Sequence, residues 1–207
     1  MKIGFIGAGR MAEAFISALI STKSTIAHKI LAGDINPLRR RLLKTRYGIN
    51  TYSRNQQVAG AAEILFLTVK PQNLEEALIE IAPLVTKDHL VISIAAGKKI
   101  SFIEALLPDA RVVRVMPNMA GIVFESMSVI CGGSKATPSD MRTACKILSC
   151  FGKVLELSEN KFDAVTALSG SGPAFFSYLL KAMADAGARE GLAPADALLL
   201  AEQTMLG

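Results

Sequence analysis

The sequence lacks any long apolar run, and this absence excludes one large class of proteins. A helix that spans a bilayer needs roughly 20 consecutive apolar residues, and Lys, Asp, Glu, Gly or Pro interrupts every candidate stretch. The N-terminus, MKIGFIGAG, has no small-residue cleavage site after an apolar stretch, so it does not resemble a secretion signal. We therefore expect a soluble, cytoplasmic protein without a membrane partner.

Cysteine and histidine are also scarce, with three and two copies among 207 residues. Cys131, Cys145 and Cys150 lack the paired spacing of a zinc site or a disulfide framework, so we expect no metal and a reducing compartment. His28 and His89 precede predicted strands and are expected at the surface. Because neither is well placed as a general acid, the sequence identifies no catalytic residue.

The formal net charge is +5, yet the positive residues are mostly scattered among Asp and Glu, which argues against a nucleic-acid partner. One predicted helix is an exception, because it carries Arg39, Arg40, Arg41, Lys44 and Arg46. A solvated helix face and phosphate recognition explain this cluster equally well. Nucleic-acid binding through the cluster ranks third and predicts an affinity that falls steeply with salt.

Short runs rich in Ile, Leu and Val alternate with helical patterns, which predicts a mainly parallel sheet covered on both faces. The predicted strands are Lys2–Ile6, Ile30–Asp34, Ile64–Val69, Leu90–Ile94, Val112–Met116, Ser128–Ile130 and Val154–Leu157. The predicted helices are Arg10–Ile20, Pro37–Arg46, Leu74–Ile81, Phe102–Leu107 and Asp140–Ser149. These elements predict one domain over residues 1–158.

Residues 159–207 show a different pattern, with a Gly/Ser turn followed by alanine-rich helices and no further strand. Pro173 and Pro194 are each placed to open a helix, and Gly191 suits the end of the first. The second helix carries several leucines that need a partner to bury them. We expect a small all-helical domain that self-associates.

The segment GAGRMA, Gly7 to Ala12, follows a predicted strand directly and opens a predicted helix. This is the G-x-G-x-x-A form of the dinucleotide-binding fingerprint. Gly7 permits the tight turn, Gly9 lets the backbone approach a diphosphate, and Ala12 lets the helix pack on the strand. The context predicts a Rossmann-type, doubly wound α/β domain that binds NAD or NADP.

Coenzyme choice stays open, because the end of the second strand carries conflicting signals. Asp34 has the separation from the fingerprint expected for an acid that bonds a ribose 2′-OH and favours NAD(H). Asn36, Arg39 and Arg40 follow it, where a cation could meet the 2′-phosphate of NADP(H). We lean to NADP(H), with NAD(H) as the alternative.

Three further segments fall at predicted carboxyl ends of strands, where open α/β sheets bind ligands. They are TVKP at Thr68–Pro71, AAG at Ala95–Gly97 and VMPN at Val115–Asn118. Any one of them could be a simple turn, but together they favour a nucleotide groove. A fourth segment, TALSGSGP at Thr166–Pro173, is expected to be a polar, flexible turn before a helix N-terminus, and it suits either a substrate carboxylate or a linker.

These pieces, in this order, resemble the pyrroline-5-carboxylate reductase family: FIGAGRMA, VKPQ, SIAAG, RVMPN and DAVTALSGSGPAF. The resemblance implies a nicotinamide-dependent reduction of the cyclic imino acid 1-pyrroline-5-carboxylate to proline, the last step of proline biosynthesis. It also implies a Rossmann domain and a helical domain that builds dimers and larger homo-oligomers.

The resemblance also assigns roles to particular positions. It places substrate at Asn118 and Glu159. It places the coenzyme at Ile6, Gly7, Ala8, Gly9, Arg10, Met11, Asp34, Asn36, Asn55, Thr68, Val69, Lys70, Pro71, Ile94, Ala95, Ala96 and Gly97.

The chain departs from the family pattern in two places. Met119-Ala120 and Ser126-Met127 stand where the family usually has Thr-Pro and Gly-Met, so the pocket floor is expected to differ. The family also continues past the final Leu206-Gly207 with further helices, including a substrate-binding Pro-Gly-Gly-Thr loop. We therefore expect a truncated helical domain.

Two rival functions remain open. A β-hydroxyacid-type dehydrogenase would want a catalytic lysine in the helical domain, where Lys181 is the candidate. A non-catalytic, regulatory NAD(P)-binding homologue is the second rival.

Overall fold

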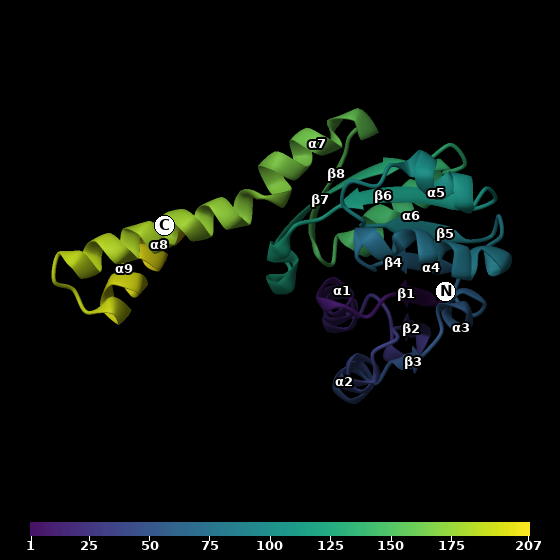
Figure 1. Ribbon diagram of the computed structural model, residues 1–207, viewed down its shortest axis with the longest axis horizontal. Helices are drawn as coiled ribbons and strands as arrows, with labels where there is room; N and C mark the ends of the chain where they lie inside the picture. The colour runs from purple at the N-terminus through teal and green to yellow at the C-terminus, as the bar shows by residue number, and fades with distance from the viewer.

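The computed structural model describes residues 1–207 and has two parts, a sheet-based domain and a helical arm (Figure 1). The domain is built on one sheet of eight strands in the order β3-β2-β1-β4-β5-β6-β7-β8. The strands are β1 Ile3–Ile6, β2 Ile30–Gly33, β3 Asn50–Tyr52, β4 Ile64–Leu67, β5 Leu90–Ser93, β6 Arg111–Met116, β7 Ser126–Gly132 and β8 Gly152–Glu156. All neighbours pair in parallel except β6 and β7, which are antiparallel.

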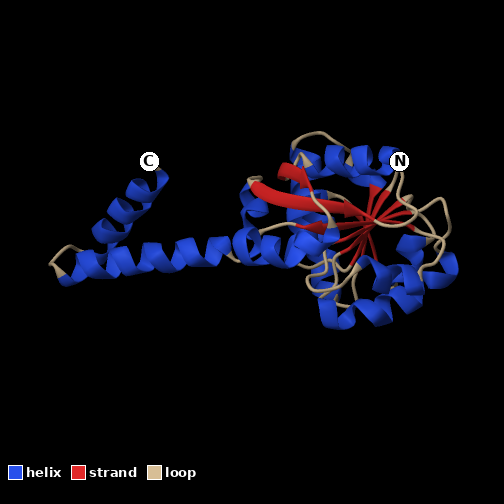
Figure 2. Ribbon diagram, turned by 90° about the horizontal axis from the view of Figure 1, so that it is seen from above, coloured by secondary structure: helices blue, strands red, loops and turns tan.

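Helices cover both faces of this sheet, as the view from above shows (Figure 2). They are α1 Arg10–Ser21, α2 Pro37–Tyr47, α3 Asn55–Ala59, α4 Leu74–Ile81, α5 Ile100–Leu106 and α6 Pro138–Leu148. One apolar cluster joins α1, α2 and α6 to the sheet, and a second joins α3, α4 and α5 to its other face. The predicted doubly wound, mainly parallel Rossmann-type sheet is therefore confirmed.

The central strands show why this layering forms. Every residue of β1, β4 and β5 is buried, as expected for parallel strands that are covered on both faces. Alternate side chains point to opposite faces, so Phe5 joins the first cluster while its neighbour Ile6 joins the second. The parallel pairing brings the carboxyl ends of β1, β2, β4, β5 and β6 to one edge.

The structure adds two elements that the sequence did not predict, β3 and α3. The three residues of β3 are exposed or half-buried, so they carry no apolar signal. Helix α3 spans five residues and packs closely on two strands, because a Cβ at Gly4 or Gly33 would meet α3 side chains within 2.6 Å. Elements this short depend on their tertiary neighbours and not on their own propensity.

The helical arm begins at α7, Phe162–Val165, and continues through a π-helical segment at Thr166–Gly170 into α8, Gly172–Arg189. Helix α8 projects away from the sheet, and α9, Pro194–Leu206, folds back along it (Figure 1). The two helices meet at Gly187, where an added Cβ would lie 3.2 Å from the Ala197 Cβ. No helix of the protein is long and apolar enough to cross a membrane.

The arm leaves much apolar surface exposed, including large side chains of both α8 and α9. Only Ala197 and Ala201 are buried in α9, and only Gly172 in α8. The exposed side chains are Phe175, Phe176, Tyr178, Leu179, Met183, Leu198, Leu199, Leu200 and Leu206.

Candidate functional site

The loop between β1 and α1 presents a row of unpaired backbone amides. The Gly7 amide donates to the Gly33 carbonyl oxygen (2.9 Å), and the Ala8 amide donates to Asp34 Oδ2 (2.8 Å). The first bond of α1 runs from the Glu13 amide to the Gly9 oxygen, so the amides of Gly9, Arg10 and Met11 have no acceptor in the chain. Unpaired amides at a helix N-terminus bind anions.

Gly7 and Gly9 of this loop differ in their backbone conformation and in the space around their Cβ positions. Gly7 has a φ of +95°, and a Cβ there would lie 2.9 Å from the Val69 amide nitrogen, so a side chain is excluded. Gly9 has a φ of −70°, which any residue adopts, and an added Cβ would meet nothing within 4 Å. Gly9 therefore borders open space, and a diphosphate on the free amides would fill that space.

Asp34, directly after β2, accepts hydrogen bonds from backbone amides of the loop and of its own turn. Its Oδ2 accepts from the Ala8 amide, and its Oδ1 accepts from the Asn36 amide (2.8 Å each). Asn36 in turn caps α2, because its Oδ1 accepts from the Leu38 amide. Both carboxylate oxygens are thus engaged with backbone, although each retains a lone pair for a ribose hydroxyl.

Asn55 begins α3 and is fixed by Glu80 of α4. Its backbone amide donates to Glu80 Oε1 (2.9 Å) and its side-chain amide donates to Oε2 (2.7 Å). A Cβ at Gly33 would lie 2.6 Å from Asn55 Oδ1, so this side chain packs directly beneath the end of β2. Asn55 therefore adjoins the Asp34 corner of the site.

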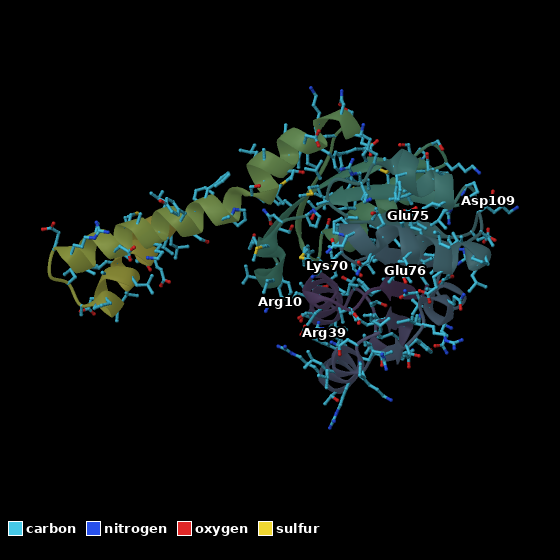
Figure 3. The ribbon with its side chains drawn as sticks, viewed as in Figure 1. Arg10, Arg39, Lys70, Glu75, Glu76 and Asp109 are labelled. Atoms are coloured by element: carbon cyan, nitrogen blue, oxygen red, sulfur yellow. The ribbon has the colours of Figure 1, made fainter.

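Two arginines of α2, Arg39 and Arg40, donate to backbone oxygens at the carboxyl ends of β1 and β2, whereas Arg46 pairs with Glu13. Arg40 Nη1 donates to the carbonyl oxygens of Asp34 and Ile35. Arg39 donates to the carbonyl oxygens of Ala8 and Gly9. Figure 3 shows Arg39 with Arg10 and Lys70 on the side of the domain from which α8 projects. Of these three basic side chains, Arg39 is paired with Glu13.

The ends of β4 and β5 form the next part of the same edge. Thr68 Oγ1 donates to the Gly7 carbonyl oxygen (2.7 Å), which ties the end of β4 to the loop. Val69, Lys70 and Pro71 follow Thr68 directly. After β5, Ile94 is half-buried, Ala95 is buried, and Ala96 and Gly97 are exposed. Gly97 has a φ of +71° and open space where a Cβ would be, which allows close backbone approach of a ligand.

Asn118, just after β6, joins the sheet domain to the helical arm. Its Nδ2 donates to the carbonyl oxygen of Ser169 (3.3 Å) in the π-helical segment. Beside it, a Cβ at Gly170 would lie 2.7 Å from Met116 Cε. The structure therefore brings VMPN and TALSGSGP together, two segments that are 51 residues apart at this contact.

The prediction of a flexible turn at Thr166–Pro173 is wrong. Residues 166–170 are π-helical and join α7 to α8, so the segment is part of an almost continuous helix. The Ser171 amide donates to the Thr166 oxygen (2.9 Å), as i→i+5 pairing requires. The wide turn accommodates the contacts of Asn118 and Met116 on one side. π-helical turns of this kind are frequent at functional sites.

Glu159 is held by two partners on the sheet domain. Its Oε1 accepts from Arg114 Nη1 (2.8 Å) and from the Ile100 amide (2.7 Å), which is the first amide of α5. Arg114 is 5% exposed, and its guanidinium lies over the Phe162 ring. Glu159 thus neutralises a buried arginine and caps α5, and Oε2 is left for any ligand.

The chain is similar to known proteins along its whole length, and this similarity identifies its family. A family described as NADP oxidoreductase coenzyme F420-dependent matches residues 2–97, and one described as pyrroline-5-carboxylate reductase dimerisation matches residues 159–207. Pyrroline-5-carboxylate reductase of Methanosarcina acetivorans is 44% identical over 207 residues, covering 100% of this chain and 77% of the relative. The chain belongs to the pyrroline-5-carboxylate reductase family.

Solved structures agree with this membership of the reductase family. The pyrroline-5-carboxylate reductase of Coxiella burnetii is 31% identical, with a TM-score of 0.92 over 100% of this chain and 77% of that one. The Plasmodium falciparum enzyme, solved with NADP bound, has 27% identity and a TM-score of 0.91, covering 100% and 76%. The first of the two family matches thus lies in the sheet domain, and the second covers the helical arm.

Other candidate chemistry lies away from this edge of the reductase fold. His28 is exposed, whereas His89 is half-buried and contacts the Ala59 oxygen, which the sequence did not predict. Both histidines precede their strands and so lie at the opposite edge. No group of three or more His, Cys, Asp or Glu side chains could hold a metal ion.

One cavity of the sheet domain also lies at the opposite edge. It measures about 1000 Å³ and is lined by residues of β7, α6 and β8, among them Cys131 and Cys145. Burial raises the pKa of both thiols, and the Glu156 carboxylate raises each further. Burial also raises the pKa of Cys150. These thiols are mostly protonated at neutral pH and are poor nucleophiles.

Two residues of the site escaped sequence reasoning, Glu13 and Glu80. Glu13 contacts α2 and Glu80 contacts Asn55, in each case across about 25 residues of sequence. Glu13 lies in the first turn of α1, where a glutamate is ordinary, and Glu80 lies in the last turn of α4. Neither position signals a contact with a distant residue.

Proposed function

We propose that this chain catalyses the NAD(P)H-dependent reduction of 1-pyrroline-5-carboxylate to L-proline. The observation that carries the proposal is the contact between Asn118 and Ser169. It places the Ser/Gly segment of the helical arm at the edge where the free loop amides lie. Relatives with this name and 35% to 44% identity align along the whole chain.

The reaction fits residues that orient the coenzyme and the substrate and that do not themselves react. A reduced nicotinamide coenzyme supplies a hydride when bound, the imine carbon accepts that hydride, and the imine nitrogen takes one proton. The chain must therefore hold two ligands edge to edge and exclude water. The free amides of Gly9, Arg10 and Met11 suit one ligand, and the junction at Asn118 suits the other. We assign no proton donor.

We assign the coenzyme to the edge formed by the carboxyl ends of the strands. Diphosphate lies at the amides of Gly9 to Met11, with Ile6, Gly7 and Ala8 shaping the turn. The remaining positions are Asp34, Asn36 and Asn55 at the adenosine ribose, and Thr68, Val69, Lys70, Pro71, Ile94, Ala95, Ala96 and Gly97 along the groove. Asn118 and Glu159 form the substrate end, Glu159 through its Oε2.

The coenzyme that we favour is NADP(H), with NAD(H) accepted less well. Asp34 already accepts two backbone amides, so it is not reserved for a ribose hydroxyl. Arg40 lies beside it, with Nη1 on the Asp34 carbonyl oxygen, and supplies a cation for a 2′-phosphate. The relative from Plasmodium falciparum was solved with NADP.

We also propose that residues 1–158 are the coenzyme domain and that residues 159–207 build a homodimer or a larger ring. The last strand ends at Glu156, and the arm that follows exposes its apolar side chains. A second copy of this chain is the partner that the dimerisation match supports. No nucleic-acid partner is proposed, because Arg39 and Arg40 are engaged by the loop.

The dehydrogenase rival depends on Lys181, and the geometry weighs against it. Lys181 is 72% exposed and pairs with Asp185 on the projecting part of α8. Its position offers no contact with the loop amides. The regulatory rival differs only in the absence of turnover, so an assay must separate it.

The test is a turnover assay with the purified chain, NADPH or NADH, and 1-pyrroline-5-carboxylate. We expect coenzyme oxidation matched mole for mole by L-proline, and no turnover of a panel of small hydroxy acids with NADP⁺ or NAD⁺. Coenzyme binding without oxidation, even at high protein concentration, would support the regulatory homologue. Oxidation of hydroxy acids would support the dehydrogenase.

A further inference from the structure

Arg39 reaches from α2 to the backbone of the diphosphate loop. Its Nε donates to the Ala8 carbonyl oxygen (2.8 Å), and its Nη2 donates to the Gly9 carbonyl oxygen (3.2 Å). The side chain is 25% exposed, so it is mostly covered by the loop and the two helices. One planar guanidinium thus contacts two successive peptide groups of the loop.

These two contacts fix the direction of the amides that have no partner. In a trans peptide the carbonyl of one residue and the N–H of the next point to opposite sides. Bonds from Arg39 to the Ala8 and Gly9 oxygens therefore turn the N–H groups of Gly9 and Arg10 away from Arg39. That side is open, because an added Cβ at Gly9 would meet nothing within 4 Å.

The preceding peptide is held in a similar way by two other elements. Thr68 Oγ1 donates to the Gly7 oxygen, and Asp34 Oδ2 accepts from the Ala8 amide. Side chains from β4, β2 and α2 thus fix three consecutive peptide groups. Arg39 is the one side chain that bonds the peptides bearing the Gly9 and Arg10 amides, and the Glu13 amide also donates to the Gly9 oxygen (3.0 Å).

Glu13 of α1 holds Arg39 in place. Its Oε2 accepts from Arg39 Nη2 (2.8 Å), and its Oε1 accepts from Arg46 Nη1 (3.1 Å) and the Tyr47 hydroxyl (3.3 Å). The Glu13 side chain is 16% exposed, whereas that of Arg46 is 64% exposed. Charge-assisted bonds between partly buried groups hold geometry better than surface pairs.

We propose that Arg39, anchored by Glu13, is a positioning residue that aims the loop amides at the diphosphate of either nicotinamide coenzyme. This role rests on the proposed function of the same site. It differs from the alternative that Arg39 reads the 2′-phosphate, because a diphosphate is common to NAD(H) and NADP(H). A loss of the aiming contact must therefore weaken both coenzymes by the same factor.

The first experiment measures the dissociation constants of NADPH and NADH for the full chain and the variant R39A by calorimetry. We expect both affinities to fall by about tenfold, with their ratio unchanged. Arg39→Lys restores the charge but not the planar fork, so it recovers little. Thermal unfolding of each variant without ligand shows whether the domain stays folded.

The matched control is R46A, which removes the same charge from α2 and the same kind of pair with Glu13. Arg46 does not touch the loop, so we expect a change of less than about twofold. Glu13→Gln keeps an acceptor for Arg39 but weakens the anchor. We therefore expect its affinity for each coenzyme to lie between those of R39A and the wild type.

If R39A unfolds, the variants R39K and E13Q still test the inference, because their affinities for two fragments of the coenzyme can be compared. ADP carries a diphosphate without a 2′-phosphate, and adenosine 2′-monophosphate carries the reverse. We expect these variants to lose affinity for ADP and to retain it for adenosine 2′-monophosphate. The opposite pattern, or a selective loss of NADPH, would overturn the inference and assign Arg39 to the 2′-phosphate.

Failure of coenzyme binding itself, on which the proposed function depends, gives a different result. In that case the wild-type chain binds neither coenzyme nor ADP, and both proposals fall together. Wild-type binding that R39A leaves unchanged for both coenzymes overturns only the positioning role.

Discussion

At the scale of single residues, the two glycines of the diphosphate loop do different work although the fingerprint lists them together. Gly7 is required by the backbone, because its φ is +95° and Val69 fills the space where a Cβ would be. Gly9 is not required by the backbone, because its φ is ordinary and its Cβ position is open, so the proposed diphosphate is the reason for a glycine there. Stability and coenzyme binding should therefore separate between the two positions.

We expect Gly7→Ala to lower the free energy of unfolding by about 1 to 3 kcal/mol, through backbone strain and the clash with Val69. Gly9→Ala should leave that free energy within about 0.5 kcal/mol of the wild type. Its methyl group should nevertheless lower NADPH affinity about tenfold or more. Urea unfolding and calorimetric titration measure the two quantities. Equal effects of the two substitutions on stability would contradict this division.

The cysteines offer a test of the charges at the opposite edge. Burial and Glu156 raise the pKa of Cys131 and Cys145, whereas Glu156 does not affect Cys150. The thiolate is the reactive form, so alkylation by iodoacetamide should be slow at neutral pH and faster as the pH rises. Glu156→Gln should speed alkylation of Cys131 and Cys145. Cys150 is the internal control, and an equal change at all three thiols would refute the assignment.

At this scale the sequence predicted which residues form the loop, but it did not predict which distant residues contact them. Gly7 is explained by local backbone geometry and Ala12 by the packing of α1, both of which a short motif encodes. The bond from the Ala8 amide to Asp34 and the contact of Arg39 with the loop join residues 26 to 31 positions apart. Such contacts depend on how α2 packs on α1, and no local pattern states that.

At the scale of elements, the start of α5 depends on a side chain from outside the helix. Glu159 accepts from the first amide of α5 and pairs with Arg114, which is almost fully buried. The resemblance to the reductase family assigned Glu159 to substrate, and this structural duty was not foreseen. Any loss of Glu159 should therefore affect folding as well as binding.

We expect Glu159→Ala to cost about 2 kcal/mol of unfolding free energy, because it leaves a buried guanidinium and a helix amide without an acceptor. The value is reduced from that of a fully buried pair because Glu159 is 29% exposed. Asp185→Ala, which breaks an exposed pair with Lys181, should cost less than about 0.5 kcal/mol. Denaturant unfolding measures both, and equal costs would contradict the account of Arg114.

Elements with a strong apolar period were predictable, and elements shaped by their neighbours were not. The buried strands β1, β4 and β5 and the helices α1, α2 and α4 were predicted to within about two residues of their observed bounds. The antiparallel direction of β7 and the π-helical segment at Thr166–Gly170 were missed. The direction of β7 depends on how it pairs with β6, the strand before it, and the π-helical segment depends on packing against the distant residues Asn118 and Met116.

At the scale of the whole molecule, the apolar surface of the arm needs a partner to bury it. The helical hairpin projects from its domain (Figure 1). It exposes several Phe and Leu side chains that it cannot bury alone. The apolar content of α9 already predicted self-association. The sequence could not predict that α8 extends away from the sheet, because this depends on the helical continuity through residue 170.

We expect the chain to sediment as a dimer or a larger assembly at micromolar concentration. Phe176→Glu combined with Leu199→Glu should shift it toward monomer, because each places a charge on the exposed apolar surface of the hairpin. Lys181→Glu, on an exposed part of α8, is the control that should leave the assembly intact. A wild-type chain that sediments as a monomer would refute the proposed assembly.

The central claim is that the free amides of Gly9, Arg10 and Met11 hold the diphosphate of a nicotinamide coenzyme. A crystal structure of the chain with NADP⁺ tests it most directly. We expect diphosphate oxygens within 2.7 to 3.2 Å of these three nitrogens, with the nicotinamide ring extending toward Asn118. A diphosphate bound at another edge of the sheet, or crystals that take up no coenzyme at saturating concentration, would contradict the account.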